Sequence, residues 1–334
     1  MSVSQPESVL VYVGLDRLGD GLLKLPFVRG LRKAFPNARI TWLAGKDTSV
    51  YAGVLKSAVA GLIDEVIEKA GIGERPSDLL RRPLPGRSFD LLIDTQRVLF
   101  GTLCVWRIKH RTFVSPFGDF AISAKKPPKG YVRPETMQRQ MMDLLEVASG
   151  QKFPTPKRLD LPIDPALRAE AERLLPVGRT YVGLAPGSGG LPKCWPLERY
   201  AALAQAQARA GRTPVFLLGP QETGWDVGLR DQMPDALFPL QQDDTGARHK
   251  FAPQLTIALA ERLAVSVAND SGVGHLCAVS GQPIISLFGR TSPKKFPPMS
   301  DRLTIIQAQQ WGDRELTAIP LAAVEQAVEA ALKP

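Results

Sequence analysis

The sequence predicts an α/β protein of two doubly wound domains, each a parallel β-sheet with helices on both faces. Three observations lead to this prediction. The chain has 334 residues, more than one ordinary hydrophobic core organises. Short apolar runs alternate with helical patterns, as in parallel sheets. The alternation stops at a Pro-rich, charged stretch near residue 155, "SGQKFPTPKRLDLPIDP", and then starts again.

The first half contains five short apolar runs and two helical stripes. Residues 22–35 place Val28, Leu31 and Phe35 on one helical face, and residues 134–149 do the same with their Met and Leu residues. We expect strands at 9–13, 40–43, 66–67, 91–94 and 112–114.

The second half repeats the order of strand, turn and helix. Its expected strands are 180–185, 214–219, 265–270, 283–289 and 303–308, and its expected helices are 196–211, 254–264, 272–281 and 320–332. The predicted organisation is a first domain over 1–155, a linker over 156–178, a second domain over 179–315 and a C-terminal segment over 316–334. Two such domains would hold a ligand in the cleft between them, at the carboxyl ends of their strands.

Composition narrows the class of protein. Apolar residues make up 44% of the chain, but no run approaches the roughly 18–20 apolar residues that span a bilayer. The first eight residues show no signal peptide, and three distant cysteines with three histidines indicate neither disulfides nor a zinc site. We therefore expect a cytoplasmic protein without a metal.

Positive charge is unevenly distributed. The net charge is +9, and residues 97–139 carry nine Lys or Arg against Asp119 and Glu135. This segment indicates an anionic partner or, alternatively, a solvated surface loop. It lacks the aromatic pattern of RNA-binding motifs, so we expect no nucleic acid.

The stretch "LDRLGDGLLKLP", Leu15 to Pro26, follows the first strand. Its glycines match neither the dinucleotide nor the P-loop spacing. Asp20 stands between two of them, and its carboxylate is a candidate either for general base or for helix cap. Asp16 is the second candidate base, although its place at the strand end favours a turn-capping role.

Two later motifs combine a strand end, small residues and a helix start. Backbone N–H groups at such a helix start can bind an anion. In "APGSGGLPKCWP", Ser188 can donate its hydroxyl and Lys193 adds a full positive charge. In "ANDSGVGHLC", Asp270 can orient the loop by capping its N–H groups, and His275 is either a ligand or a structural histidine. Glu222, after the strand "PVFLLG", can accept hydrogen bonds from a ribose or simply favour the start of a helix.

Taken together, these motifs resemble glycosyltransferase family 9, the ADP-heptose:lipopolysaccharide heptosyltransferases and their relatives. The resemblance spans nearly the whole chain in the right order. It rests on "RLGDGLLKLPFVRGLRKAFPNARITWLAG", "APGSGGLPKCWPLERYAALA" and "VANDSGVGHLCAVSGQPIISLFG". The departures are Cys194, where the family often has Arg or His, and "QQDDTGARHKFAPQ", which would border the base or the sugar.

The resemblance implies a GT-B fold, in which two Rossmann-like domains face each other and the second holds most of the nucleotide sugar. It implies an inverting, metal-independent transfer from a nucleotide sugar, with ADP-heptose as the first candidate and no cofactor. It also implies a final helix that crosses back to the first domain. The implied roles are base for Asp20, diphosphate contact for Ser188, Gly189 and Lys193, ribose contact for Glu222, and diphosphate and sugar loop for Asp270, Ser271, Gly272 and His275.

The first domain would then receive the acceptor, an anionic glycolipid of the lipopolysaccharide core at the cytoplasmic face of the inner membrane. The candidate acceptor contacts are Lys24, Arg97, Lys109 and Arg111. Two other functions stay open: a GT-B enzyme acting on another nucleotide sugar, such as another transferase or an epimerase, and a non-catalytic glycan- or nucleotide-binding relative.

Overall fold

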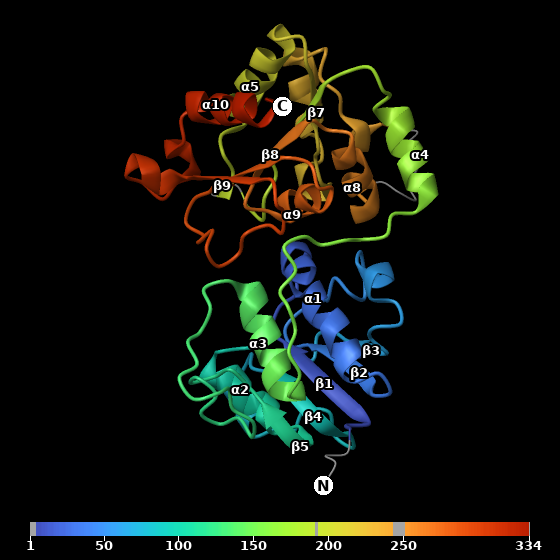
Figure 1. Ribbon diagram of the computed structural model, residues 1–334, viewed down its shortest axis with the longest axis vertical. Helices are drawn as coiled ribbons and strands as arrows, with labels where there is room; N and C mark the ends of the chain where they lie inside the picture. The colour runs from blue at the N-terminus through green and yellow to red at the C-terminus, as the bar shows by residue number, and fades with distance from the viewer. Residues whose placement is uncertain (1–4, 191–192, 243–250, 334) are drawn as a thin grey trace. The chain divides into compact units, whose positions relative to one another are not determined.

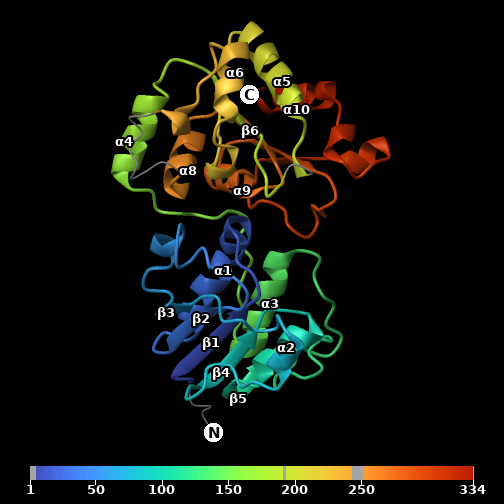
Figure 2. The same ribbon diagram turned by 180° about the vertical axis from the view of Figure 1, so that it is seen from behind.

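A computed structural model describes residues 5–190, 193–242 and 251–333 (Figure 1). Its contacts divide the chain into two compact units, residues 1–156 and 157–334. Each unit is an α/β domain around one five-stranded parallel sheet, as the sequence predicts. Figure 2 shows the same chain from behind, with the first unit in blue to green and the second in green to red.

The sheet of the first unit has the strand order β3-β2-β1-β4-β5. Its central strand β1 is buried on both faces, which explains its continuous apolar sequence. Each predicted strand of this half is present. Their bounds are Ser8–Val13 (β1), Arg39–Ala44 (β2), Glu65–Ile67 (β3), Ser88–Asp94 (β4) and Lys109–Val114 (β5).

Helices cover both faces of this sheet. Helices α1 (Leu18–Ala34) and α3 (Met137–Ser149) pack against each other, and an added Cβ at Gly30 of α1 would lie 2.5 Å from a methyl group of Leu145 in α3. Helix α2 (Leu99–Trp106), which we did not predict, packs Cys104 and Val105 onto Leu10 and Tyr12 of β1. The short 3₁₀ helices are η1 (Lys56–Val59) and η2 (Pro76–Leu79).

The predicted turn around Asp20 is helical. Helix α1 begins at Leu18, four residues before the expected start, so Asp20 lies in its first turn. The glycine at position 21 serves packing, because an added Cβ would lie 2.5 Å from a methyl carbon of Val50. The glycines therefore permit a close helix–loop contact rather than a flexible turn.

The second unit has the strand order β10-β9-β8-β6-β7. All five predicted strands form; β6, β8 and β9 are buried along their whole length, whereas the edge strand β10 is mostly half-buried. Their bounds are Tyr181–Ala185 (β6), Thr213–Phe216 (β7), Val265–Asn269 (β8), Ile284–Phe288 (β9) and Leu303–Gln307 (β10). The predicted helices are α5 (Leu197–Arg209), α8 (Pro253–Glu261), α9 (Gly272–Val279) and α10 (Leu321–Ala331).

Among the described residues of the second unit, the helices α4 and α6 were not predicted. The expected linker contains α4 (Pro165–Leu174), which is capped by Asp164 and packs on α8. Its three buried apolar residues give too short a stripe to stand out beside the prolines. Helix α6 (Trp225–Gln232) follows the 3₁₀ helix η4 (Pro220–Glu222). The remaining short 3₁₀ helices are η5 (Pro239–Gln241), η6 (Ala308–Trp311) and η7 (Leu316–Ala318).

The final helix α10 contributes to the core of the second unit. Its buried Val324 and Val328 belong to the same apolar cluster as Val265 and Ile285 of the sheet. The expectation that this helix also crosses to the first domain stays a prediction.

Candidate functional site

Asp16 lies at the centre of a buried polar cluster at the β1–α1 junction. Its carboxylate accepts hydrogen bonds from Lys24 Nζ at 3.0 Å, Trp42 Nε1 at 2.9 Å and Ser49 Oγ at 2.9 Å. Only 2% of the residue is exposed. These partners use its lone pairs and shield it from any ligand. Asp16 is therefore structural, and it is neither a turn cap nor a second candidate base.

Asp20 stands in the first turn of α1 and remains partly exposed. The N-cap position belongs to Arg17, and no hydrogen bond to the Asp20 carboxylate is found within the described part of the chain. The helix start places partial positive charge beside the carboxylate. The structure thus removes the capping alternative for Asp20 and leaves its carboxylate accessible.

Neighbouring side chains hold the first turn of α1 in place. The buried hydroxyl of Tyr51 donates to the carbonyl oxygen of Gly21 at 2.7 Å, and the Tyr51 N–H donates to Ser49 Oγ at 3.2 Å. Ser49 is also a partner of Asp16, so one connected set of bonds links β2, the following loop and the start of α1. This set fixes the helix turn that carries Asp20.

Three of the four predicted acceptor contacts are either paired inside the unit or lie away from the carboxyl edge of the sheet. Lys24 is buried and paired with Asp16, so its charge is already neutralised. Lys109 and Arg111 lie at the amino end of β5, whereas ligands of parallel sheets bind at the carboxyl ends. Arg111 in addition faces Asp90, with 3.4 Å between Nη1 and Oδ1.

Arg97 is the predicted acceptor contact that lies at the carboxyl edge. It follows β4, donates from Nη1 to the carbonyl oxygen of Pro116 at 2.9 Å and lies 3.6 Å from Asp119. Burial and the nearby positive charge of Arg133 lower the pKa of Arg97. Two arginines therefore come together at this edge, an arrangement that favours a bound anion.

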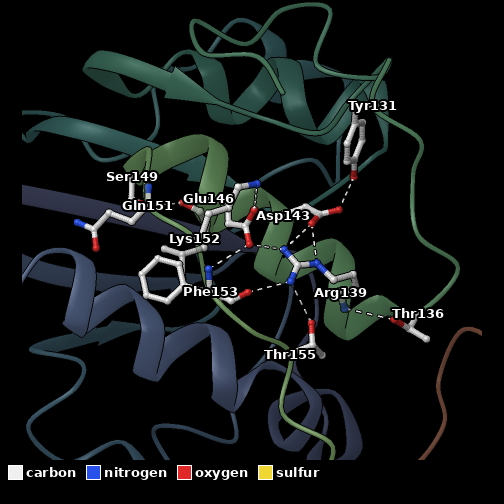
Figure 3. Close-up of polar contacts among 11 residues, drawn as sticks. Tyr131, Thr136, Arg139, Asp143, Glu146, Ser149, Gln151, Lys152, Phe153 and Thr155 are labelled. Atoms are coloured by element: carbon white, nitrogen blue, oxygen red, sulfur yellow. Dashed lines mark hydrogen bonds and ion pairs between the residues drawn. The ribbon is translucent and has the colours of Figure 1, made fainter. Parts of the chain in front are cut away.

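Arg139, the last cation of the basic segment, is satisfied within the first unit (Figure 3). Its guanidinium contacts Asp143 at 2.6 Å and Glu146 at 2.5 Å on the same helix, α3. Glu146 also pairs with Lys152 at 2.7 Å. This cluster braces the end of the first unit, so the free positive charge of the basic segment is smaller than its composition indicates.

In the second unit, the loops after β6 and β8 meet. Ser188 Oγ lies 3.4 Å from the carbonyl oxygen of Asp270, with the hydroxyl as donor. Gly189 and Lys193 are exposed on the β6–α5 loop, and Leu191 and Pro192 between them lie outside the described residues. An added Cβ at Gly187 would lie 2.4 Å from Oε1 of Glu222, so only glycine lets this loop approach that carboxylate.

Asn269 connects these loops and was missed by sequence reasoning. The residue is fully buried at the end of β8. Its Oδ1 accepts from the Trp195 N–H at 3.1 Å and from the Tyr200 hydroxyl at 3.1 Å, while its Nδ2 donates to the Pro186 carbonyl at 2.6 Å. The only sequence signal was an amide at a buried strand end, next to the predicted Asp270.

The loop after β8 begins α9 with a serine cap. Ser271 Oγ accepts from the Gly274 N–H at 3.3 Å. Ser271 therefore occupies the N-cap position of α9, and the expected capping of loop N–H groups by Asp270 stays a prediction. Gly272 opens the helix, and its first turn presents N–H groups suited to an anion.

His275 is buried in α9, with 7% of the residue exposed. Burial lowers its pKa to about 4, so the ring is neutral at pH 7. It can then contribute a single N–H or acceptor nitrogen but no positive charge.

Glu222 lies at the end of β7 behind the Gly187 loop. It is buried, accepts the Gly219 N–H at 2.9 Å, and has a pKa raised by burial. No cation pairs with it within the residues that the structure describes. A second hydrogen-bond donor, such as a hydroxyl, would satisfy its remaining acceptor positions.

A small pocket of about 110 Å³ opens beside these loops and is lined by Lys193, Asp270, Gly289, Arg290, Thr291 and Leu316. Arg290 is held there by Glu315, with 2.6 Å between Nε and Oε1. The stretch 241–254, which we expected to border a base or a sugar, lies largely outside the described residues.

Comparison with known proteins gives one family. The profile of glycosyltransferase family 9 (heptosyltransferase) matches residues 79–319. Lipooligosaccharide heptosyltransferase 2 of Haemophilus influenzae is 29% identical over 47% of the chain and 49% of its own length. Lipopolysaccharide heptosyltransferase 3 of Escherichia coli is 23% identical over 85% of the chain and 83% of its own length.

Solved structures share the fold. A family 9 glycosyl transferase from Veillonella parvula superposes with a TM-score of 0.69 at 22% identity, covering 99% of this chain and 98% of the other. An Escherichia coli heptosyltransferase solved with ADP superposes with a TM-score of 0.65 at 19% identity, covering 97% and 99%.

Proposed function

Because the chain belongs to glycosyltransferase family 9, we propose that it transfers heptose from ADP-heptose to an anionic acceptor of the lipopolysaccharide core. One observation carries this proposal. The second unit brings Lys193, Ser188 and the start of α9 to the same edge of one sheet, with the buried Glu222 behind them. This edge can hold a diphosphate and a ribose together.

Each part of the donor would meet a different group. Lys193 and the helix N-termini of α5 and α9 would hold the diphosphate, and the Ser188 hydroxyl would donate to it. Glu222 would accept from the ribose hydroxyls, which supply the donor that this buried carboxylate lacks. An ADP-linked donor is supported by the heptosyltransferase solved with ADP.

The leaving diphosphate would be stabilised without a metal. Negative charge develops on it as the bond to the sugar breaks, and preorganised cations and N–H groups offset that charge. No group of three or more His, Cys, Asp or Glu side chains is arranged to hold a metal ion among the residues that the structure describes. In this proposal Lys193 would supply the main positive charge.

Asp20 would act as the general base. The acceptor hydroxyl attacks the anomeric carbon from the face opposite the diphosphate, which inverts the configuration, and Asp20 takes the hydroxyl proton. The accessible carboxylate in the first turn of α1 suits this role.

The first unit would receive the acceptor. Burial, and then the positive charge of Arg133, lower the pKa of Arg97, and the carboxylates and phosphates of a lipopolysaccharide core would stabilise the positive charge of Arg97. Such an acceptor is anchored in lipid, so the protein would work at the cytoplasmic surface of the inner membrane. None of the helices that the structure describes is both long and apolar enough to span a bilayer.

A nucleotide screen followed by a transfer assay tests this function. ADP should raise the melting temperature of the protein more than UDP or GDP at equal concentration. Incubation with ADP-heptose and a core acceptor should release ADP and give a product of inverted anomeric configuration by NMR. A preference for UDP or GDP would assign a different donor, and binding without transfer would indicate a non-catalytic relative.

A further inference from the structure

Helix α2 carries an apolar face that the first unit does not cover. No charged residue occurs between Arg97 and Arg107, so the helix is apolar except for Thr102, whose hydroxyl donates to Asp94. Such a helix is normally buried on all sides. Here Cys104 and Val105 point into the core, but Leu99 and Trp106 are 51% and 52% exposed.

The exposed residues follow helical spacing. Leu99, Leu103 and Trp106 are three and four residues apart, which places them along one face about 10 Å long. Leu103 is half-buried, and Val98, the N-cap residue just before the helix, is 62% exposed. We call these four residues the α2 stripe.

Positive charge flanks the α2 stripe at its C-terminal end. The Arg107 guanidinium donates to the carbonyl oxygens of Arg81 at 3.0 Å and Leu80 at 3.4 Å, so the loop after η2 lies against the end of the helix. Leu80 is 84% exposed, and Arg81 and Arg82 are exposed beside it.

Acidic charge near the α2 stripe is sparse. Gly73 packs against Gly101 of α2, which brings the exposed Glu74 to this side of the unit. Asp78 is buried and accepts hydrogen bonds from backbone N–H groups of Glu74 and Arg75. The surface around the stripe therefore keeps a net positive charge.

We propose that the α2 stripe and the arginines beside it dock the protein on the surface of an anionic bilayer. Leucine and tryptophan side chains enter the boundary between head groups and acyl chains, and arginines pair with anionic head groups. A second copy of the chain is a poorer occupant, because a two-fold contact would set the same arginines against each other. The docking surface deepens the proposed function, since a lipid-anchored acceptor is reached at a bilayer.

Vesicle binding by the intact protein tests the proposal. Vesicles of phosphatidylglycerol and phosphatidylethanolamine should bind the protein, and phosphatidylcholine vesicles should bind it much less. Leu99→Ser/Trp106→Ser and Arg81→Glu/Arg82→Glu should each lower the partition coefficient about tenfold or more. The Trp106 emission, obtained by subtracting the Trp106→Phe spectrum, should shift to the blue on binding.

Matched variants in the second unit separate the surface from a general effect. Val177→Ser/Val227→Ser removes two exposed apolar residues, and Arg179→Glu/Arg209→Glu reverses two exposed charges. Both should bind vesicles as the wild type does. The proposal is overturned if the wild type does not prefer anionic vesicles, if the stripe variant binds them equally, or if the controls lose as much binding.

The proposed docking surface and the proposed function can be refuted independently of each other. Vesicle binding needs neither donor nor acceptor sugar, and transfer to a core oligosaccharide freed of its lipid needs no vesicle. The stripe variants should keep that transfer. A protein that docks through α2 but transfers no heptose would refute the function alone, and transfer without docking would refute the surface alone.

Discussion

Substitution by asparagine should have different effects at Asp16 and at Asp20, lowering stability at the first and the transfer rate at the second. Asp16→Asn leaves the Lys24 ammonium buried without its counter-charge and keeps only one acceptor oxygen for three donors. Removing one partner of a buried ion pair costs about 3–5 kcal/mol. For a unit of this size, each kcal/mol shifts the melting temperature by about 2–4 °C, so the first unit should melt roughly 6–20 °C lower.

Asp20→Asn removes no contact that the structure shows for its carboxylate, so the melting temperature should stay within a degree or two. Its transfer rate should fall about 10²–10⁴-fold if Asp20 is the general base, with donor affinity nearly unchanged. Scanning calorimetry and a steady-state assay with saturating donor measure the two effects.

A double variant provides the internal control for Asp16. Asp16→Asn/Lys24→Met removes the unpaired ammonium and fills its place with an apolar chain, so it should recover much of the lost stability. The reasoning is refuted if Asp16→Asn melts like the wild type. It is also refuted if the double variant is no more stable than the single one.

Three further outcomes follow from the structure. Lys193→Met should weaken ADP binding and lower kcat. ADP titration measures the first effect and single-turnover kinetics the second. If the ADP affinity and the rate are both unchanged, Lys193 does not belong to the donor site. Asn269→Ala should lower the free energy of unfolding by about 2–4 kcal/mol and raise the donor KM, because it leaves Trp195 N–H and Pro186 C=O unpaired. Urea unfolding measures the stability and steady-state kinetics the KM. A loss of stability with a normal KM would limit Asn269 to a role in folding. Burial raises the pKa of Asp94 to about 6, although hydrogen bonds from Thr102, the Gln96 N–H and Ser115 lower it in part. The native state therefore keeps a proton on Asp94 that the unfolded chain releases near pH 4. Stability from this group should therefore fall by about 2 kcal/mol as the pH rises from 4 to 6. Urea midpoints should be measured against pH for the wild type and for Asp94→Asn. The difference between the two should fall as the pH rises, and a difference that does not change with pH would contradict this reasoning.

The strands and the candidate site of the second unit were accessible from the sequence, because both depend on local pattern. A buried parallel strand is mostly apolar, so β1, β4, β8 and β9 can be recognised in the sequence. The residues after these strands necessarily gather at one edge of the sheet. Ser188, Ser271 and Glu222 could be placed near one another for this reason alone.

The roles of individual charges depended on partners distant in the sequence. The Trp42 and Ser49 side chains decide that Asp16 is structural, and Asp16 in turn neutralises Lys24. Lys109 looked like an acceptor contact until β5 placed it at the amino edge. A count of charges cannot reveal pairing, because pairing requires coordinates from another segment.

The sequence by itself determined two parallel sheets, their order of elements and the kind of groups at their carboxyl edges, since hydrophobic periodicity and turn chemistry are local. Only the tertiary structure decided which aspartate is buried, that Asn269 joins the loops after β6 and β8, and that α2 keeps an apolar face in contact with solvent. Whether a residue is buried depends on which other segments pack against it. The eight residues of α2 do not indicate that no other segment packs against its outer face.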